Sequence, residues 1–231
     1  MALILSIETS TTVCSVALHD KGKTIAYLEE QQPNSHAAVL TVLIEKLLLD
    51  QKIPIQNIDA LAISSGPGSY TGLRIGVSVA KGICFALKKP LIAVSTLQII
   101  AAHAASLIPT SDNTTLICPM IDARRMEVYA ALYTSDLKIF RSVEAEIITS
   151  DSYQTILTEH PIIFCGNGSQ KCQELIQHKN AYFTPNIYAP AFIMGELAFK
   201  KYKIKDFEDV AYFEPFYLKK FVATTPKKPL F

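Results

Sequence analysis

The stretch LILSIETSTTVCSVALHDKGKTIAYLEE, residues 3–30, decides the fold that we expect for this chain. Residues 3–7 form a short apolar run, and in residues 13–18 successive side chains alternate as they do in a strand. A third run, residues 23–30, follows the turn DKG. Because both connections are short, the three predicted strands form an antiparallel meander.

Helices and strands alternate after this meander. The first helix is expected over residues 36–49, with Asn34 or Ser35 as its N-cap. The later elements are a buried strand at 60–63, a helix at 69–87, a strand at 90–95 and a helix at 96–107. The order βββαβαβα predicts an α/β half-domain like that of ribonuclease H, with parallel inner strands.

The second half of the chain reads as a shorter version of the first. After the polar loop TSDNTT we expect two strands about a short turn over residues 115–133, and a strand, glycine turn and helix over 161–177. A last helix is expected over residues 189–203, and the following residues contain too much proline to form one. We therefore predict two lobes, 1–108 and 109–231, each a mixed sheet with flanking helices, and expect the last segment, about 190–231, to pack back on the first lobe.

Composition narrows the class of protein. Of 231 residues 49% are hydrophobic and only 19% are charged, which is ample for a core and indicates either unusually complete burial or apolar surface kept for a partner. A net charge of +1 gives no reason to expect direct nucleic-acid binding. The N-terminal apolar run is too short for a signal peptide, and no stretch reads as a membrane span. The five cysteines show no metal spacing, so we expect buried, reduced thiols in a cytoplasmic protein.

The turn between the strand at 60–63 and the next helix has two interpretations. A glycine-rich turn at a helix start can bind an anion, and the residues that would do so are Gly66, Gly68, Ser69, Thr71 and Arg74. However, the spacing matches neither GxxxxGK[ST] nor GxGxxG. The alternative is a tight turn whose glycines supply backbone angles that other residues rarely adopt.

The helices at 36–49 and 69–87 are apolar nearly all round, although a helix over a sheet needs only one apolar stripe. Burial of both helices in a deep core is one interpretation. Because so small a half-domain could hardly cover two such helices, we predict instead that they form a partner surface, helix against helix. Its candidate residues are His36, Val39, Leu40, Leu43, Leu47, Gly72, Leu73, Gly76, Val79, Ala80 and Ile83. Glycine in mid-helix costs about 1 kcal/mol relative to alanine, so Gly76 is predicted to let a partner helix approach closely. Gly76→Leu is then expected to fold and to associate poorly.

Catalytic chemistry is poorly represented, and we predict neither catalytic nor metal-binding residues. The histidines are scattered, with no HExxH or HxxxH pair, and no GxSxG motif occurs. In the turn SIETSTT, Glu8 stands where actin- and hexokinase-type ATPases place an acidic residue, but Ser10 stands where their phosphate hairpin has glycine. The charged turn DARRMEVY, residues 122–129, is interpreted as a salt-bridged surface turn, with anion capture by its arginines as the alternative.

Four stretches in order resemble the TsaB (YeaZ) family of tRNA threonylcarbamoyladenosine biosynthesis. They are LSIETSTTVCSVAL, SSGPGSYTGLRIGVSVAKG, IDARRMEVY and FEPFYLK, and the resemblance covers essentially the whole chain. It implies the two-lobed ASKHA fold and a relation to TsaD and to proteins once labelled glycoprotease or M22 peptidase. The paired-histidine metal motif of TsaD is absent from this sequence, which points to the non-catalytic member.

The resemblance also implies partners. TsaD would bind the two apolar helices, TsaE would join the larger complex, and the same surface could serve a homodimer when the chain is alone. ATP and a metal would belong to the assembled complex rather than to this chain, and tRNA would be contacted only indirectly. The alternatives are a metal-dependent glycoprotease-like peptidase and a stand-alone ASKHA ATPase or kinase.

Overall fold

A computed structural model describes residues 2–31, 36–108 and 114–219. In the first lobe a meander of three strands is followed by alternating helices and strands, as predicted. Its elements are β1 (Leu3–Glu8), β2 (Cys14–Asp20), β3 (Lys23–Glu30), α1 (His36–Asp50), the 3-10 turn η1 (Ile55–Asn57), β4 (Ala60–Ser64), α2 (Tyr70–Leu87), β5 (Leu91–Val94) and α3 (Thr96–Leu107). The strands form one sheet in the order β3-β2-β1-β4-β5, in which β1, β4 and β5 are parallel. The candidate N-caps of the first helix, Asn34 and Ser35, lie outside the described residues.

The second lobe repeats this topology. Its elements are β6 (Leu116–Asp122), β7 (Glu127–Thr134), β8 (Ile139–Ile147), α4 (Gln154–Glu159), β9 (Ile162–Cys165), η2 (Gln170–Cys172), β10 (Ala181–Thr184), η3 (Ala191–Ile193) and α5 (Met194–Ile204). The sheet order β10-β9-β6-β7-β8 matches β5-β4-β1-β2-β3 strand for strand. The predicted internal echo is therefore present in the topology.

The prediction of a helix after the glycine turn of the second lobe is wrong. In its place the chain forms only the short 3-10 turn η2. The Ser169 hydroxyl donates to the carbonyl of Gly166, 2.8 Å away, and so caps no helix. A short segment without a cap does not offset the cost of starting a helix.

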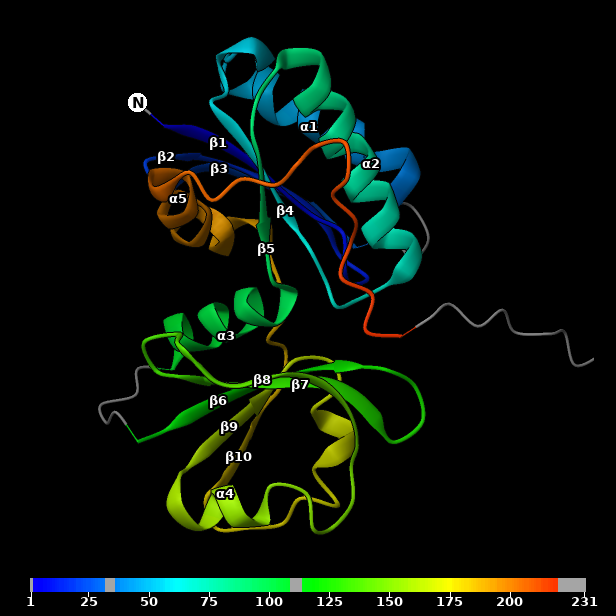
Figure 1. Cartoon of the computed structure of the whole chain (residues 1–231), viewed down its shortest axis with the longest axis vertical. Coiled ribbons are helices and arrows are strands. Elements are labelled where there is room, and N and C mark those ends of the chain that lie inside the picture. Colours follow the sequence, from blue (N-terminus) through cyan, green and yellow to red (C-terminus); the bar gives the residue numbers. More distant parts are fainter. Residues whose placement is uncertain (1, 32–35, 109–113, 220–231) are drawn as a thin grey trace, which may run out of the picture.

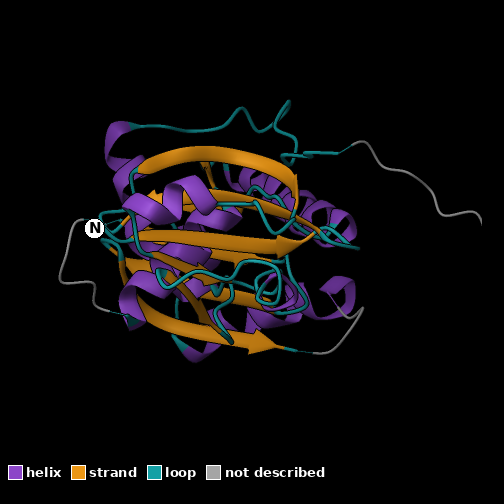
Figure 2. Cartoon of the chain, turned by 90° about the horizontal axis from the view of Figure 1, so that it is seen from below, coloured by secondary structure: helices purple, strands orange, loops and turns teal. Residues whose placement is uncertain are grey.

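The core consists of three apolar layers, one on the outer face of each sheet and one between the two sheets (Figure 1). The outer face of the first sheet packs against α1 and α2, and the outer face of the second sheet packs against α4 and η2. Between the sheets a third cluster combines α3 and α5 with the inner faces of both. Viewed along the long axis of the molecule, the strands run side by side with helices on both sides of them (Figure 2).

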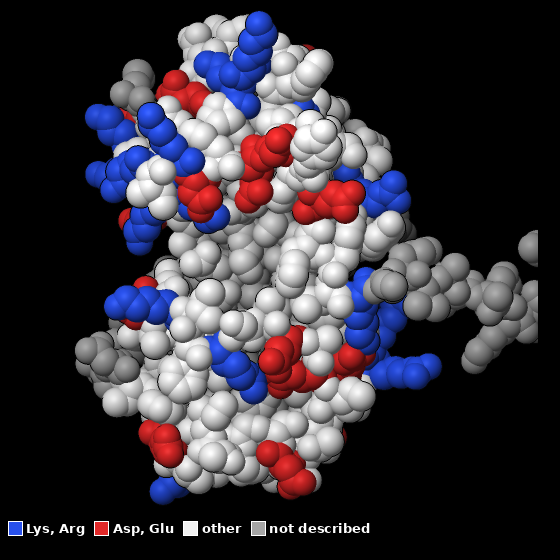
Figure 3. Space-filling view, viewed as in Figure 1, with Lys and Arg blue, Asp and Glu red and all other residues white. Residues whose placement is uncertain are grey.

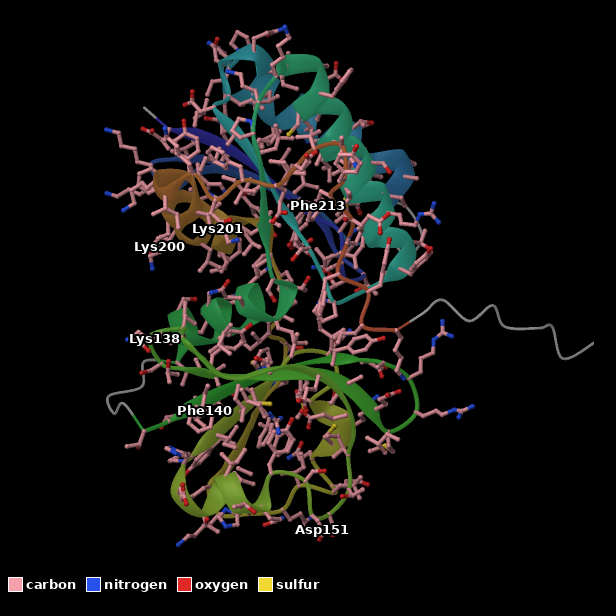
Figure 4. The ribbon with its side chains drawn as sticks, viewed as in Figure 1. Lys138, Phe140, Asp151, Lys200, Lys201 and Phe213 are labelled. Atoms are coloured by element: carbon pink, nitrogen blue, oxygen red, sulfur yellow. The ribbon has the colours of Figure 1, made fainter. Side chains whose placement is uncertain are left out.

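The last described segment lies against the first lobe. Helix α5 contacts β5 and β1. Beyond it the Glu208 amide donates to the Leu91 carbonyl over 2.9 Å, and the Phe216 amide donates to the Ser65 carbonyl over 2.7 Å. Phe213, labelled in Figure 4, packs against the cluster beneath α2. The chain thus crosses back over the first lobe before it reaches Lys219, which pairs with Glu127 of the second lobe.

No helix among the described residues is both long enough and apolar enough to cross a membrane.

Candidate functional site

Helices α1 and α2 lie side by side on the outer face of the first sheet (Figure 1). Each buries one face in the core below. Four of the predicted interface residues remain half-buried: Val39, Leu43, Val79 and Ile83. Three further apolar side chains on the same two helices reach solvent: Val42 is 58% exposed, Leu49 69% and Phe85 83%. These three residues and the four half-buried ones are called the helix-pair surface below.

The small-residue seam of α2 does not face outward, so the prediction made for it is wrong. A Cβ atom at Gly76 would lie 2.2 Å from the Thr9 hydroxyl, and one at Gly72 would lie 2.0 Å from the Thr9 carbonyl oxygen. Thr9 in turn donates from its hydroxyl to the Gly72 carbonyl over 2.8 Å. The missing side chains admit the β1–β2 turn, and Gly76 has a packing reason inside the chain.

Seven of the predicted interface residues are buried within the chain itself. Because their side chains pack on the first sheet or on the β1–β2 turn, they offer no free surface in this structure. They are His36, Leu40, Leu47, Gly72, Leu73, Gly76 and Ala80. His36 also holds the turn, with its Nε2 atom 3.0 Å from the Thr11 carbonyl oxygen. A partner could therefore reach only the outward-facing residues of α1 and α2, and binding there stays a prediction.

Sequence reasoning missed the residues that are most exposed. Val42 and Leu49 are seven residues apart, which places them on one face of α1, and both stand among polar neighbours. Gly82 in α2 is exposed, and no atom lies within 4 Å of the Cβ it lacks. Unlike Gly76, Gly82 has no reason within the chain for its missing side chain. This contrast could not be read from the sequence, where both are mid-helix glycines.

The glycine-rich turn before α2 uses its polar groups inside the chain. The Ser69 amide donates to the Ser10 carbonyl over 2.7 Å, and the Ser69 hydroxyl caps the helix by accepting from the Gly72 amide over 3.2 Å. Gly66 has a positive φ of 107° and lies against the Phe216 carbonyl, which leaves no room for a side chain. Thr71 and Arg74 are exposed, and Arg74 contacts the Tyr70 ring and hydroxyl. Anion binding by this turn stays a prediction.

Glu8 is a fully buried carboxyl at the end of β1. Its Oε1 atom accepts from the amide and the hydroxyl of Ser10, whereas Oε2 has no hydrogen-bond partner among the described residues. Burial raises the pKa of Glu8 to about 7, against the opposing effect of the Ser10 hydrogen bonds. The carboxyl therefore keeps its proton in the folded chain at pH values where it would lose it in water.

We expect this buried carboxyl to make stability depend on pH. Because the pKa is raised from 4.5 to about 7, the folded state binds more protons than the unfolded state between those values. The contribution is fully present below pH 4.5 and is lost as pH rises through about 7, by about 3 kcal/mol at most. Denaturant unfolding from pH 4.5 to pH 8 should show this fall in native protein and not in Glu8→Gln. An equal fall in both would contradict the assignment.

The hairpin between β6 and β7 carries four charged residues, Asp122, Arg124, Arg125 and Glu127. Asp122 pairs with Lys171, and Glu127 pairs with Lys219. Lys171 also donates to the carbonyls of Arg125 and Glu127, over 2.6 and 2.7 Å. The predicted salt-bridged turn is thus only half right, because the cations that close it are Lys171 and Lys219 and not the arginines.

The cysteines are free and buried, as predicted. Burial raises the pKa of all five thiols, so none is held as a reactive thiolate. In the part of the chain that the structure describes, no three His, Cys, Asp or Glu side chains are grouped so that they could hold a metal ion.

Comparison with known proteins decides the family. The family model of TsaD, described as tRNA N6-adenosine threonylcarbamoyltransferase, matches residues 29–227. The TsaB protein of Bacillus subtilis is 30% identical over 177 residues, which is 75% of both chains, and that of Escherichia coli is 38% identical over 133 residues, 58% of this chain and 55% of that protein. The chain belongs to the TsaB family, within the group that the TsaD model describes. Both relatives are named tRNA threonylcarbamoyladenosine biosynthesis proteins, and the match spans about half the length of the Escherichia coli one.

Solved structures agree with the TsaB assignment. YeaZ from Pseudomonas aeruginosa has a TM-score of 0.80 at 27% identity, covering 94% of this chain and 100% of that one. The Lmo2764 protein of Listeria monocytogenes, with a TM-score of 0.50 at 10% identity, covers 87% of this chain and 99% of that one. The second likeness shows the fold alone, and it fits the predicted two-lobed ASKHA architecture.

Two of the four stretches that resemble the TsaB family meet in space. Residues 5–18 contribute the turn that contains Thr9 and Ser10, and residues 64–82 contribute the glycines on which that turn packs. The signature of the TsaB family in this chain therefore builds the support beneath α2.

Proposed function

We propose that this chain is a non-catalytic scaffold or activator subunit that binds TsaD. The complex would form threonylcarbamoyladenosine at position 37 of tRNAs that read codons beginning with A. The observation that carries the proposal is the helix-pair surface, where apolar side chains of two adjacent helices stand in solvent. Apolar side chains that stand in solvent on adjacent helices are what a partner surface would offer.

TsaD is the proposed partner because it belongs to the group whose family model matches this chain, so that its own fold would offer a similar helix pair. Two such pairs can pack helix against helix. When alone, the chain would pair with a second copy through the same surface, and TsaE would join the TsaD complex. We propose that the chain alone binds no cofactor, that ATP and a metal belong to the complex, and that the complex works in the cytoplasm.

Depletion of the protein in its host is expected to remove threonylcarbamoyladenosine from tRNA, as measured by mass spectrometry of digested nucleosides. Re-expression of the native chain should restore the modification. Unchanged modification after depletion would overturn the proposed function. Co-purification of TsaD with the native chain tests the partner separately, because a chain that acted alone would restore the modification without binding TsaD.

A further inference from the structure

We propose that the β6–β7 hairpin and the segment that ends at Lys219 form a binding surface for the phosphate backbone of RNA. This departs from the indirect contact with tRNA that the sequence resemblance implies. Net charge alone hides the surface, because the chain as a whole carries only +1. What matters is where the unpaired cations lie.

Arg124 and Arg125 are both exposed at the tip of the hairpin. Neither guanidinium makes a hydrogen bond or a close ion pair with any residue that the structure describes, although Arg124 lies near enough to Asp122 for their charges to interact. The two carboxylates of the hairpin, Asp122 and Glu127, are already paired with Lys171 and Lys219. The four cations of the cluster thus outnumber its carboxylates by two, and the excess charge is on the arginines.

The backbone at this tip is one that arginine rarely adopts. Arg124 has φ 71° and Arg125 has φ 50°, both in the left-handed region that favours Gly, Asn and Asp. Lys171 holds the turn in place through two backbone carbonyls. Folding alone therefore does not require arginine at either position. A guanidinium presents paired donors that match the oxygens of a phosphate group.

A groove with aromatic and basic side chains adjoins the hairpin. Tyr217 lies two residues before Lys219, and its ring centre is 4.8 Å from that of Tyr70. Together with Arg74, Lys81 and Glu214 these rings line a groove of about 580 Å³ between α2 and the last described segment, so its basic side chains outnumber its one carboxylate. Aromatic rings beside basic side chains are typical of surfaces that bind single-stranded nucleic acid.

Basic side chains also mark the end of the described chain, whose last residue is Lys219. In Figure 3 basic side chains gather beside the place where the described chain ends, at the level between the two lobes. Two adjacent arginines beside Lys219 fit an extended polyanion better than a single phosphate ion. The choice of tRNA as that polyanion rests on the proposed function, whereas binding to RNA phosphate does not.

The test compares two double variants of the full chain. Arg124→Asn with Arg125→Gly removes both charges and places residues at the tip that accept a positive φ, so the fold should be at least as stable. Lys21→Asn with Lys205→Gly is the matched control, because both lysines are exposed, have positive φ and lie outside the hairpin. Thermal melting should show that both variants are folded.

Binding of a labelled tRNA transcript is measured for the native chain and both variants over a series of salt concentrations. The hairpin variant is expected to bind about tenfold more weakly, and its plot of log affinity against log salt should be shallower by about 1.4, since two phosphate contacts are lost. The control should match the native chain. The proposal would be overturned if the hairpin variant bound tRNA with the affinity and salt dependence of the native chain. It would also be overturned if the variant lost binding only to vesicles of anionic lipid or to inorganic phosphate, and not to tRNA.

TsaD binding by the hairpin variant separates this inference from the proposed function. Because the hairpin lies outside the helix-pair surface, TsaD should be retained when RNA binding is lost. If the native chain binds RNA through the hairpin but does not bind TsaD, the proposed function fails and this inference stands. If the native chain binds TsaD and the hairpin variant binds RNA as well as the native chain does, this inference fails and the proposed function stands.

Discussion

A chain carrying Gly82→Arg is expected to fold normally and to lose its affinity for TsaD by about one to two orders of magnitude. Gly82 is exposed on α2, and its missing Cβ has no atom within 4 Å, so the isolated chain has room for any side chain. A partner helix packed on this face would meet the new side chain, and overpacking costs about 1–3 kcal/mol. Sedimentation of the variant mixed with TsaD measures the loss.

Two further variants distinguish a loss of TsaD binding from a loss of stability. Thr155→Arg places the same side chain on the exposed face of α4 in the second lobe and should bind TsaD as the native chain does. Gly82→Ala should raise the free energy of unfolding of the isolated chain by about 1 kcal/mol, because alanine favours the helix and nothing in the chain fills the space. Wild-type affinity in Gly82→Arg would show that TsaD binds elsewhere.

Gly76→Leu is expected to unfold the chain or to lower its free energy of unfolding by about 3 kcal/mol or more. A Cβ at this position would lie 2.2 Å from the Thr9 hydroxyl and 3.1 Å from the Ile63 side chain, so the β1–β2 turn would have to move. Denaturant unfolding followed by circular dichroism measures the loss, and Gly82→Leu on the same helix is the matched control. A Gly76→Leu chain as stable as the control would contradict the packing described here.

Gly76 and Gly82 show which parts of this structure the sequence could predict and which it could not. Alternation in residues 13–18 and the apolar run at 60–63 depend on local periodicity, and the predicted strands and their order are present in the structure. The seam in α2 could not be placed in the same way. Its orientation depends on the turn at Thr9, 63 residues from Gly72 in the sequence, and local periodicity carries no information about such a contact.

Other differences between the predictions and the structure also come from contacts between residues far apart in the sequence. The partners of Asp122 and Glu127 are lysines 49 and 92 residues away, so the neighbouring arginines appeared to be the natural ion-pair partners. The short strand β10 was not predicted, because its four residues form a strand only by pairing with β9. Helices α1 and α2 were predicted as apolar nearly all round, and sequence alone could not tell which apolar residues the first sheet covers.

The apolar layer between the sheets limits how this molecule can move. Enzymes that close around a substrate bend at a hinge, and their two halves part to admit water between them. Here Ile4, Ile92 and Val94 of the first sheet share one cluster with Ile117 and Tyr133 of the second. Opening the chain like a clamshell would expose this cluster to solvent, which is unfavourable in proportion to its area. The shared cluster therefore opposes a hinge motion that would part the two sheets.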